Sequence, residues 1–225
     1  MEQLESPTKA LDWRKNTSEE WKNPSLESAG LAQRWRAQGR TRFLDLGCGL
    51  GRHSVYFAKE GFEVDAMDLS GYSIASTREW AAREGVQVRT HCGNMLTLPF
   101  PDNTFDCALA FHVIYHTDTQ GVRRILSEMR RVLRNGAEWY LTLIAKENPG
   151  FRDAPQSRRM DENTVLRDDS DTERNVPHFY AGAQELERVL EGFTILEDPV
   201  REAQYSLRNA AYGTTHWKLL VRCEK

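Results

Sequence analysis

The residues best suited to ligand chemistry form a glycine-rich turn. Gly47, Gly49 and Gly51 stand within five positions, directly after a short apolar run. Such a turn after a first strand lets the backbone approach a bound ligand. The dinucleotide pattern G-x-G-x-x-G would place its third glycine where this chain has Arg52, and Asp45 just ahead of the turn would repel a pyrophosphate. The turn therefore predicts a cationic or ammonium-bearing ligand and not a nicotinamide dinucleotide.

Two positions farther along the chain suit an adenosine. Asp68 lies at the expected tip of the second strand, where its carboxylate could accept hydrogen bonds from both ribose hydroxyls. Asn94 and Met95 follow the expected third strand. The amide oxygen of Asn94 could accept from an adenine amino group while Met95 packs on the ring. Together with the glycine turn, these residues predict an adenosine-containing ligand.

The segment FHVIYHTD (111–118) supplies the candidate catalytic side chains His112, Tyr115 and His116. A histidine here titrates near neutral pH and could take a proton from a hydroxyl or a thiol. The alternative is that His116 caps or braces the following helix. A four-residue spacing of histidines suits a metal on a helix. We expect a strand end and a loop here, so no metal site is predicted.

Alternating strand-like and helix-like segments from residue 42 onward predict an α/β fold. We expect strands at 42–47, 62–68, 86–92, 105–113 and 137–145, with helices at 52–60, at 71–84 behind a Ser70 cap, and within the arginine-rich stretch 123–136, ended by Asn135-Gly136. A helix at 181–192 precedes strands at 193–203 and 215–223. No helix separates these last two strands, which predicts an antiparallel pair in a mixed sheet.

Composition limits the class of protein. The chain has 225 residues and a formal net charge of -3, so nothing draws it generally to nucleic acid. It has no apolar run of membrane-spanning length, and its N-terminal stretch is polar and acidic, which predicts a soluble, cytoplasmic protein. The cysteines occur singly, without a C-x-x-C spacing, and are expected to be reduced; they are Cys48, Cys92, Cys107 and Cys223.

Three stretches carry a family resemblance: FLDLGCGLGRHSVYFAKEGFEVDAMDLS (43–70), NMLTLPFPDNTFD (94–106) and MRRVLRNGAEWYLTL (129–143). They resemble the successive motifs of class I S-adenosylmethionine-dependent methyltransferases. The resemblance implies a Rossmann-like, doubly wound, seven-stranded mixed sheet of order 3-2-1-4-5-7-6 with strand 7 antiparallel. The cofactor-binding residues implied are Asp45, Gly47, Cys48, Gly49, Gly51, Asp68, Leu69, Asn94, Met95 and Phe111. The family commonly has Asp at position 94, but an amide keeps the hydrogen-bond acceptor.

We expect one domain over residues 1–225. Its parts would be an N-terminal helical cap (1–40), a cofactor-binding core (41–145), an insertion or lid (146–181), and a C-terminal helix and hairpin (182–225). The insertion, with Arg152, Arg158, Arg159 and Arg167 among its residues, could cover an anionic acceptor or be a plain surface loop. His216 and Trp217 lie in a segment that often borders the acceptor in this family, but strand alternation favours packing for both.

The resemblance implies methyl transfer in line to O, N or S of a small-molecule acceptor. A looser likeness to the branch with tellurite-resistance and thiopurine-type enzymes also favours a small molecule. DNA is not expected, because the chain lacks the (D/N)-P-P-(Y/F) tetrapeptide and a nucleophilic Pro-Cys pair. Methylation of tRNA or protein, a cofactor-binding module without catalysis, and a nicotinamide-dependent oxidoreductase are the alternatives. Oligomeric state does not follow from the sequence.

Overall fold

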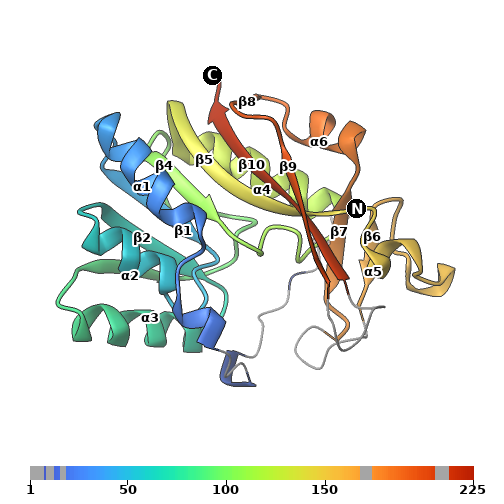
Figure 1. Cartoon of the computed structure of the whole chain (residues 1–225), viewed down its shortest axis with the longest axis horizontal. Helices are drawn as coiled ribbons and strands as arrows, with labels where there is room; N and C mark the ends of the chain where they lie inside the picture. The colour runs from blue at the N-terminus through green and yellow to red at the C-terminus, as the bar shows by residue number, and fades with distance from the viewer. Residues whose placement is uncertain (1–7, 9–12, 16–18, 168–173, 206–212) are drawn as a thin grey trace.

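The computed structural model describes residues 8, 13–15, 19–167, 174–205 and 213–225. Its centre is a twisted sheet of order β3-β2-β1-β4-β5-β10-β8 (Figure 1). These strands are β3 Val88–Cys92, β2 Glu63–Asp68, β1 Arg42–Leu46, β4 Phe105–Ala110, β5 Leu133–Ala145, β10 Gly213–Cys223 and β8 Phe193–Ile195. With β8 and β10 as strands 6 and 7, this is the predicted order.

Strand direction follows the prediction as well. The pairs β1/β2, β2/β3, β1/β4 and β4/β5 are parallel, whereas β10 is antiparallel to both β5 and β8. Strands β1 and β4 are buried over most of their length, as expected for parallel strands covered on both faces. The mixed sheet with an antiparallel strand at the position of β10 is therefore confirmed. The described residues form ten strands and not the predicted seven, because three further strands pair outside this central order.

Helices cover both faces because the strand order reverses after β1. Helices α2 (Arg52–Lys59) and α3 (Gly71–Arg83) connect strands on one side of β1, and α4 (Thr119–Val132) connects β4 to β5 on the other. Right-handed crossovers in opposite directions place these helices on opposite faces. Ser70 caps α3 by accepting from the Ser73 N–H at 3.3 Å, as predicted, and Asp118 caps α4.

The junction of α4 and β5 differs from the prediction. The helix ends at Val132 and β5 begins at once at Leu133, before Asn135-Gly136. The register of β5 on β4 shifts between Phe105 and Cys107, and Gly136 has a φ of 76°. The glycine therefore serves a bulge within the strand and does not stop the helix.

The segment after α6 (Ala183–Val189) forms two strands where one was predicted at 193–203. β8 ends at Ile195 and β9 covers Val200–Tyr205, each pairing with a different part of β10. Pro199 lies between them, and a residue without an N–H cannot continue a ladder. Strand β4 is also shorter than predicted, ending at Ala110.

The 146–181 segment contains regular structure that the sequence did not reveal. It holds α5 (Pro149–Arg152), a short 3-10 turn at Gln156–Arg158, and the strands β6 (Thr164–Leu166) and β7 (Pro177–Ala181). β7 pairs in parallel with the end of β5 through Ile144 and Tyr180. At Ile144, one edge of β5 pairs with β10. β7 therefore lies along the opposite edge of β5, the edge that pairs with β4 earlier in the strand, beyond the point where β4 ends. These strands are too short for an alternating pattern to show.

The described part of residues 1–40 contains short helices. These are 3-10 turns at Trp13–Lys15 and Glu19–Lys22 and the helix α1 (Glu27–Ala37). Glu138, buried in β5, anchors α1 by accepting from Arg34 Nε at 2.8 Å and from the Trp35 indole at 3.0 Å. Among the described residues, no helix has the length and apolar character to cross a bilayer.

Candidate active site

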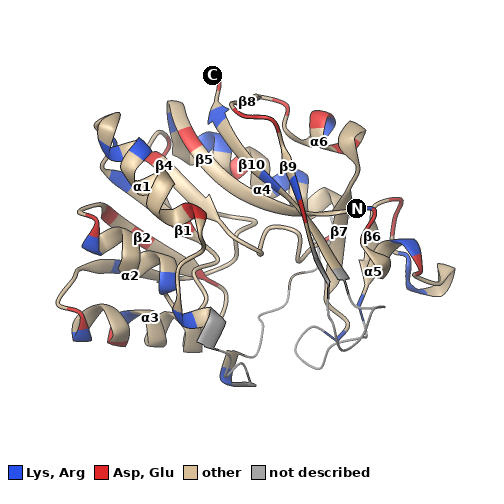
Figure 2. Ribbon diagram, in the orientation of Figure 1, with Lys and Arg blue, Asp and Glu red and all other residues tan. Residues whose placement is uncertain are grey.

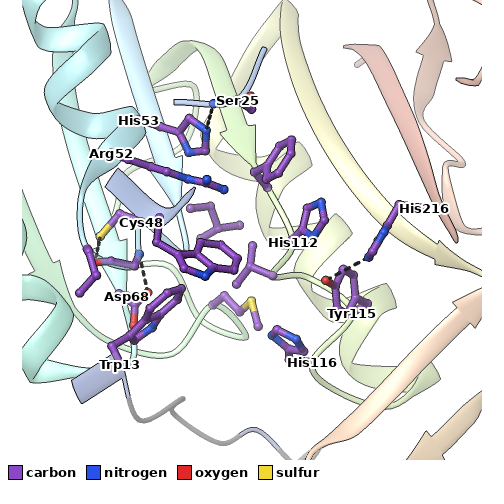
Figure 3. A pocket seen from close by; sticks show the side chains of 18 of the residues that line it. Trp13, Ser25, Cys48, Arg52, His53, Asp68, His112, Tyr115, His116 and His216 are labelled. Carbon is purple, nitrogen blue, oxygen red and sulfur yellow. Dashed lines mark hydrogen bonds between the residues drawn. The ribbon is translucent and has the colours of Figure 1, made fainter. Parts of the chain in front are cut away.

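A cavity of about 700 Å³ opens at the carboxyl ends of β1, β2 and β4, where ligands of open α/β sheets bind (Figure 3). Most of the predicted cofactor-binding residues line it: Gly47, Cys48, Gly49, Asp68, Leu69, Asn94, Met95 and Phe111. The three predicted catalytic side chains line it too, and they are His112, Tyr115 and His116. Asp45 and Gly51 do not reach the cavity wall.

Protein atoms approach each glycine of the turn closely. All three have positive φ values, of 72° at Gly47, 53° at Gly49 and 97° at Gly51. A Cβ on Gly47 would lie 2.2 Å from a methyl carbon of Val113, and one on Gly51 would lie 2.9 Å from the Cα of Thr77. The turn therefore needs glycine both for its left-handed backbone and for its packing against the loop after β4 and against α3.

Asp68 combines contact with the glycine turn and access to the cavity. Its carboxylate accepts from the Gly49 N–H at 2.9 Å and from the Ser70 N–H at 2.8 Å. Burial raises the pKa of Asp68, with these backbone hydrogen bonds opposing the shift. A carboxylate has about four acceptor positions, so two backbone donors leave capacity for a ligand.

Asp45 lies behind the turn and is 1% exposed. Its carboxyl group accepts from the Ser54 hydroxyl at 2.5 Å, and burial raises its pKa to about 7. The side chain thus links the end of β1 to α2.

Asn94 holds its own turn together. Its amide oxygen accepts from the Leu96 N–H at 3.0 Å, and its amide nitrogen donates to the Thr8 hydroxyl at 2.9 Å. An amide oxygen has a second lone pair, so this contact leaves one acceptor position for a ligand. Met95 lines the cavity beside it and packs against the core. Cys48 is buried in the turn, and burial raises the pKa of its thiol, which makes it unreactive.

His112 occupies a left-handed backbone conformation with a φ of 57°. Its N–H donates to the Thr142 hydroxyl at 2.8 Å, and its ring stacks on Phe111 with centroids 4.3 Å apart. Burial lowers the pKa of His112 well below the usual value, and nearby cationic groups such as Arg52 add to the shift. The imidazole is therefore neutral at pH 7.

Sequence reasoning assigned His216 to packing, but the structure places it in the cavity wall. The ring of His216 lies 4.1 Å from that of His112, and its Nε2 is 3.4 Å from the Tyr115 hydroxyl. Thr214, His216 and Lys218 all line the cavity. The two-residue period of β10 was the signal that could have identified this face. Trp217 points the other way and donates to the Ala181 carbonyl at 2.8 Å.

Arg52 and His53 are buried in the cavity wall (Figure 3). The guanidinium of Arg52 lies 4.6 Å from the ring centroid of Trp21 and 5.3 Å from that of Phe111. His53 Nε2 accepts from the Ser25 N–H at 3.1 Å, and burial lowers the pKa of His53 to about 3. The start of α2 thus ties the N-terminal segment to the cavity.

The charges around the cavity are largely balanced. Lys218 pairs with Glu202 at 2.8 Å and also with Glu27, and all three side chains line the cavity. Figure 2 shows both basic and acidic residues on helices α1 and α3. Among the described residues, no group of three His, Cys, Asp or Glu side chains is arranged to hold a metal ion.

Comparison with known proteins gives a consistent assignment. A family model described as a methyltransferase domain matches residues 43–136. A protein of Encephalitozoon cuniculi named as a methyltransferase is 32% identical over 181 residues, which cover 77% of this chain and 81% of that protein. Ajmaline N-methyltransferase of Rauvolfia serpentina is 29% identical over 127 residues, covering 55% of this chain and 42% of the enzyme. For the sterol and alkaloid methyltransferases among its relatives, the chain spans only 28% to 42% of their length.

Solved structures agree on the fold. A SAM-dependent methyltransferase of Methanosarcina mazei superposes with a TM-score of 0.68 at 21% identity, covering 82% of this chain and 93% of that one. The 1,6-didemethyltoxoflavin-N1-methyltransferase of Burkholderia thailandensis, solved with S-adenosylhomocysteine, gives a TM-score of 0.59 at 22% identity, covering 89% and 79%. The chain therefore belongs to the methyltransferases, and its fold is that of the class I S-adenosylmethionine-dependent enzymes.

Proposed function

We propose that this protein transfers a methyl group in line to an oxygen, nitrogen or sulfur atom of a small-molecule acceptor. One observation carries the proposal: a single cavity of about 700 Å³ joins the glycine turn and Asp68 to the rings of His112, Tyr115 and His216. Relatives with small-molecule names, such as ajmaline N-methyltransferase and sarcosine/dimethylglycine N-methyltransferase, support an acceptor of this size.

The residues present fit the cofactor. Asp68 offers carboxylate oxygens at the tip of β2 for the ribose hydroxyls, and the backbone of residues 47–50 borders the space for the methionine part. Met95 and Phe111 provide apolar surface for the adenine, and the amide of Asn94 stands beside them. The bound cofactor supplies a methyl group on a sulfonium, which leaves readily as a thioether. Asp45 and Gly51 would act on this site through the shape of the turn.

The chain's own contribution is alignment and the exclusion of water. The Trp13 ring lies over the glycine turn, within 3.0 Å of the position that a Cβ on Gly49 would take. Trp21 packs edge-on against Trp13, and Arg52 lies over the Trp21 ring. His112, Tyr115 and His116 stand at the opposite side of the cavity as the groups that would orient the acceptor and receive its proton.

Two experiments test this function. Calorimetry measures the binding of S-adenosylhomocysteine, and the protein is then incubated with radiolabelled S-adenosylmethionine and a fractionated metabolite extract. We expect micromolar binding and transfer of label to a small, extractable compound. A site that binds a nicotinamide dinucleotide instead, or transfers label only to macromolecules, would contradict the proposal. Asp68→Asn serves as the binding-deficient control, because it removes the charge that faces the ribose.

A further inference from the structure

Tyr115 and His216 are brought together from segments far apart in the chain. Tyr115 follows β4, whereas His216 lies on β10, whose pairing with β5 places it opposite Ile144. Both side chains line the cavity, and the Tyr115 hydroxyl points toward His216 Nε2 at 3.4 Å (Figure 3). Two groups able to exchange a proton therefore meet in the wall opposite the glycine turn.

We propose that Tyr115 and His216 form a proton relay for an acceptor whose attacking atom is a hydroxyl oxygen or a thiol sulfur. This inference rests on the proposed function and goes further, since it selects the acceptor class and assigns the final proton acceptor to His216. Tyr115 contacts the acceptor, and His216 receives the proton that Tyr115 releases.

Both members of the pair are held in place. The Tyr115 carbonyl accepts from the Phe179 N–H of β7 at 2.8 Å, and the Tyr115 ring lies beside that of His178, with centroids 5.8 Å apart. His216 is fixed by β10 and packs against the His112 ring. Both side chains are buried. A fixed pair transfers a proton without first losing rotamer freedom.

The surrounding charges favour an uncharged acceptor with a removable proton. The charged or titratable side chains that line the cavity or touch the pair are His112, His116, His53, His178, Arg52, Arg167, Lys218, Glu27, Glu202, Asp68 and Cys48. Glu202 is the β9 register partner of His216, yet both it and Glu27 are paired with Lys218. Asp68 is held by backbone donors at the glycine turn, away from the pair. Beside the pair, an ammonium acceptor would therefore meet carboxylates that Lys218 already neutralises, together with the cofactor's own positive charge.

The proposed step balances. The acceptor's O–H or S–H proton passes to the Tyr115 oxygen as the Tyr115 proton passes to His216 Nε2. The acceptor atom forms a bond to the methyl carbon, and the carbon–sulfur bond breaks with its electron pair left on sulfur. The positive charge lost from the sulfonium appears on the His216 imidazolium, so the net charge of the buried site is unchanged and no new charge has to be solvated.

Activity on defined probes gives the first test. Labelled S-adenosylmethionine is offered with catechol, benzyl mercaptan or pyridine, using the wild type, Tyr115→Phe, His216→Gln and the control His91→Gln. His91 is a β3 histidine outside the cavity. We expect methylation of catechol or benzyl mercaptan, a fall in kcat of about 100-fold or more in the two relay variants, and an unchanged Kd for S-adenosylhomocysteine. Retained kcat in His216→Gln, or methylation of pyridine alone, would overturn the relay.

Nitrogen NMR of ¹⁵N-histidine protein gives a readout that needs neither turnover nor cofactor, and it decides the case if no probe is methylated. The His216 signals are assigned from their loss in His216→Gln. We expect a neutral ring at pH 7, protonated on Nδ1, with an Nε2 signal that shifts in Tyr115→Phe. A ring protonated on Nε2 would overturn the relay. Failure of S-adenosylhomocysteine to bind would instead refute the proposed function, and the NMR measurement of the His216 ring would still stand.

Discussion

Alanine at Gly47 should be among the most destabilising small substitutions in the chain, for two separable reasons. The residue has a φ of 72°, and a left-handed conformation costs a residue with a Cβ about 1–2 kcal/mol. The added Cβ would also lie 2.2 Å from one Val113 methyl carbon and 2.8 Å from the other. Forcing an extra carbon into packed space costs about 1–3 kcal/mol. We therefore expect Gly47→Ala to lower the free energy of unfolding by about 2–5 kcal/mol.

Gly85→Ala is the matched control. Gly85 has a φ of 68°, but nothing lies within 4 Å of the position that its Cβ would take. Gly85→Ala should therefore lower the free energy of unfolding only by the cost of the left-handed backbone conformation, about 1–2 kcal/mol. The difference between the two variants then measures the contact with Val113. Val113→Ala in the Gly47→Ala background removes both methyl carbons, so part of that difference should return as a favourable coupling energy.

Urea unfolding monitored by tryptophan fluorescence and circular dichroism provides the free energies, with m compared among variants to check that the unfolding reaction is unchanged. Equal losses for Gly47→Ala and Gly85→Ala would show that the turn does not pack on the loop after β4 as described. An absence of coupling with Val113→Ala would show that the methyl carbons of Val113 are not the source of the extra cost.

Three further outcomes are expected. Asp68→Asn should weaken S-adenosylhomocysteine binding by about 10-fold or more in calorimetry, since hydrogen bonds to charged groups contribute about 1.5–3 kcal/mol. The pKa of Asp45 is about 7 in the folded state and lower in the unfolded state, so folding takes up a proton in this range. The free energy of unfolding of the wild type should therefore fall as the pH rises from about 4 to about 7. Urea titrations of Asp45→Asn should show no such dependence. Glu138→Ala should release α1, seen as faster amide exchange over residues 27–37, and cost about 1–3 kcal/mol, because the buried Trp35 indole N–H loses its acceptor.

The parallel half of the fold follows from local sequence signals. The apolar runs that became β1, β2 and β4 are short, buried and bounded by turn residues, and Ser70 marks the start of α3 as its side chain predicts. These features depend on neighbours in sequence. The bulge at Gly136 does not, since it arises from the pairing of Leu133 with Phe105, and an isolated Asn-Gly pair looks the same at a helix end and in a bulged strand.

The site divides in the same way. Asp68 ends one strand that the sequence already revealed, and Asn94 and Met95 follow another, so their convergence at one sheet edge was predictable. Arg52 and His53 were not separable from exposed helix residues, because their burial depends on Trp21 and Ser25 from the N-terminal segment.

His216 shows most clearly what strand alternation alone leaves open. The alternation in β10 predicts that Thr214, His216 and Lys218 share one face of the strand. Whether that face lines the cavity depends on the pairing with β5, whose Ile144 lies opposite His216. A shift of one residue in the register between β10 and β5 would point Trp217 into the cavity and His216 toward the opposite face of the sheet. The Trp217 indole instead donates to the Ala181 carbonyl of β7, which fixes the register from the opposite side of the sheet. The 146–181 segment, through β7, thereby determines which side chain of β10 faces the acceptor.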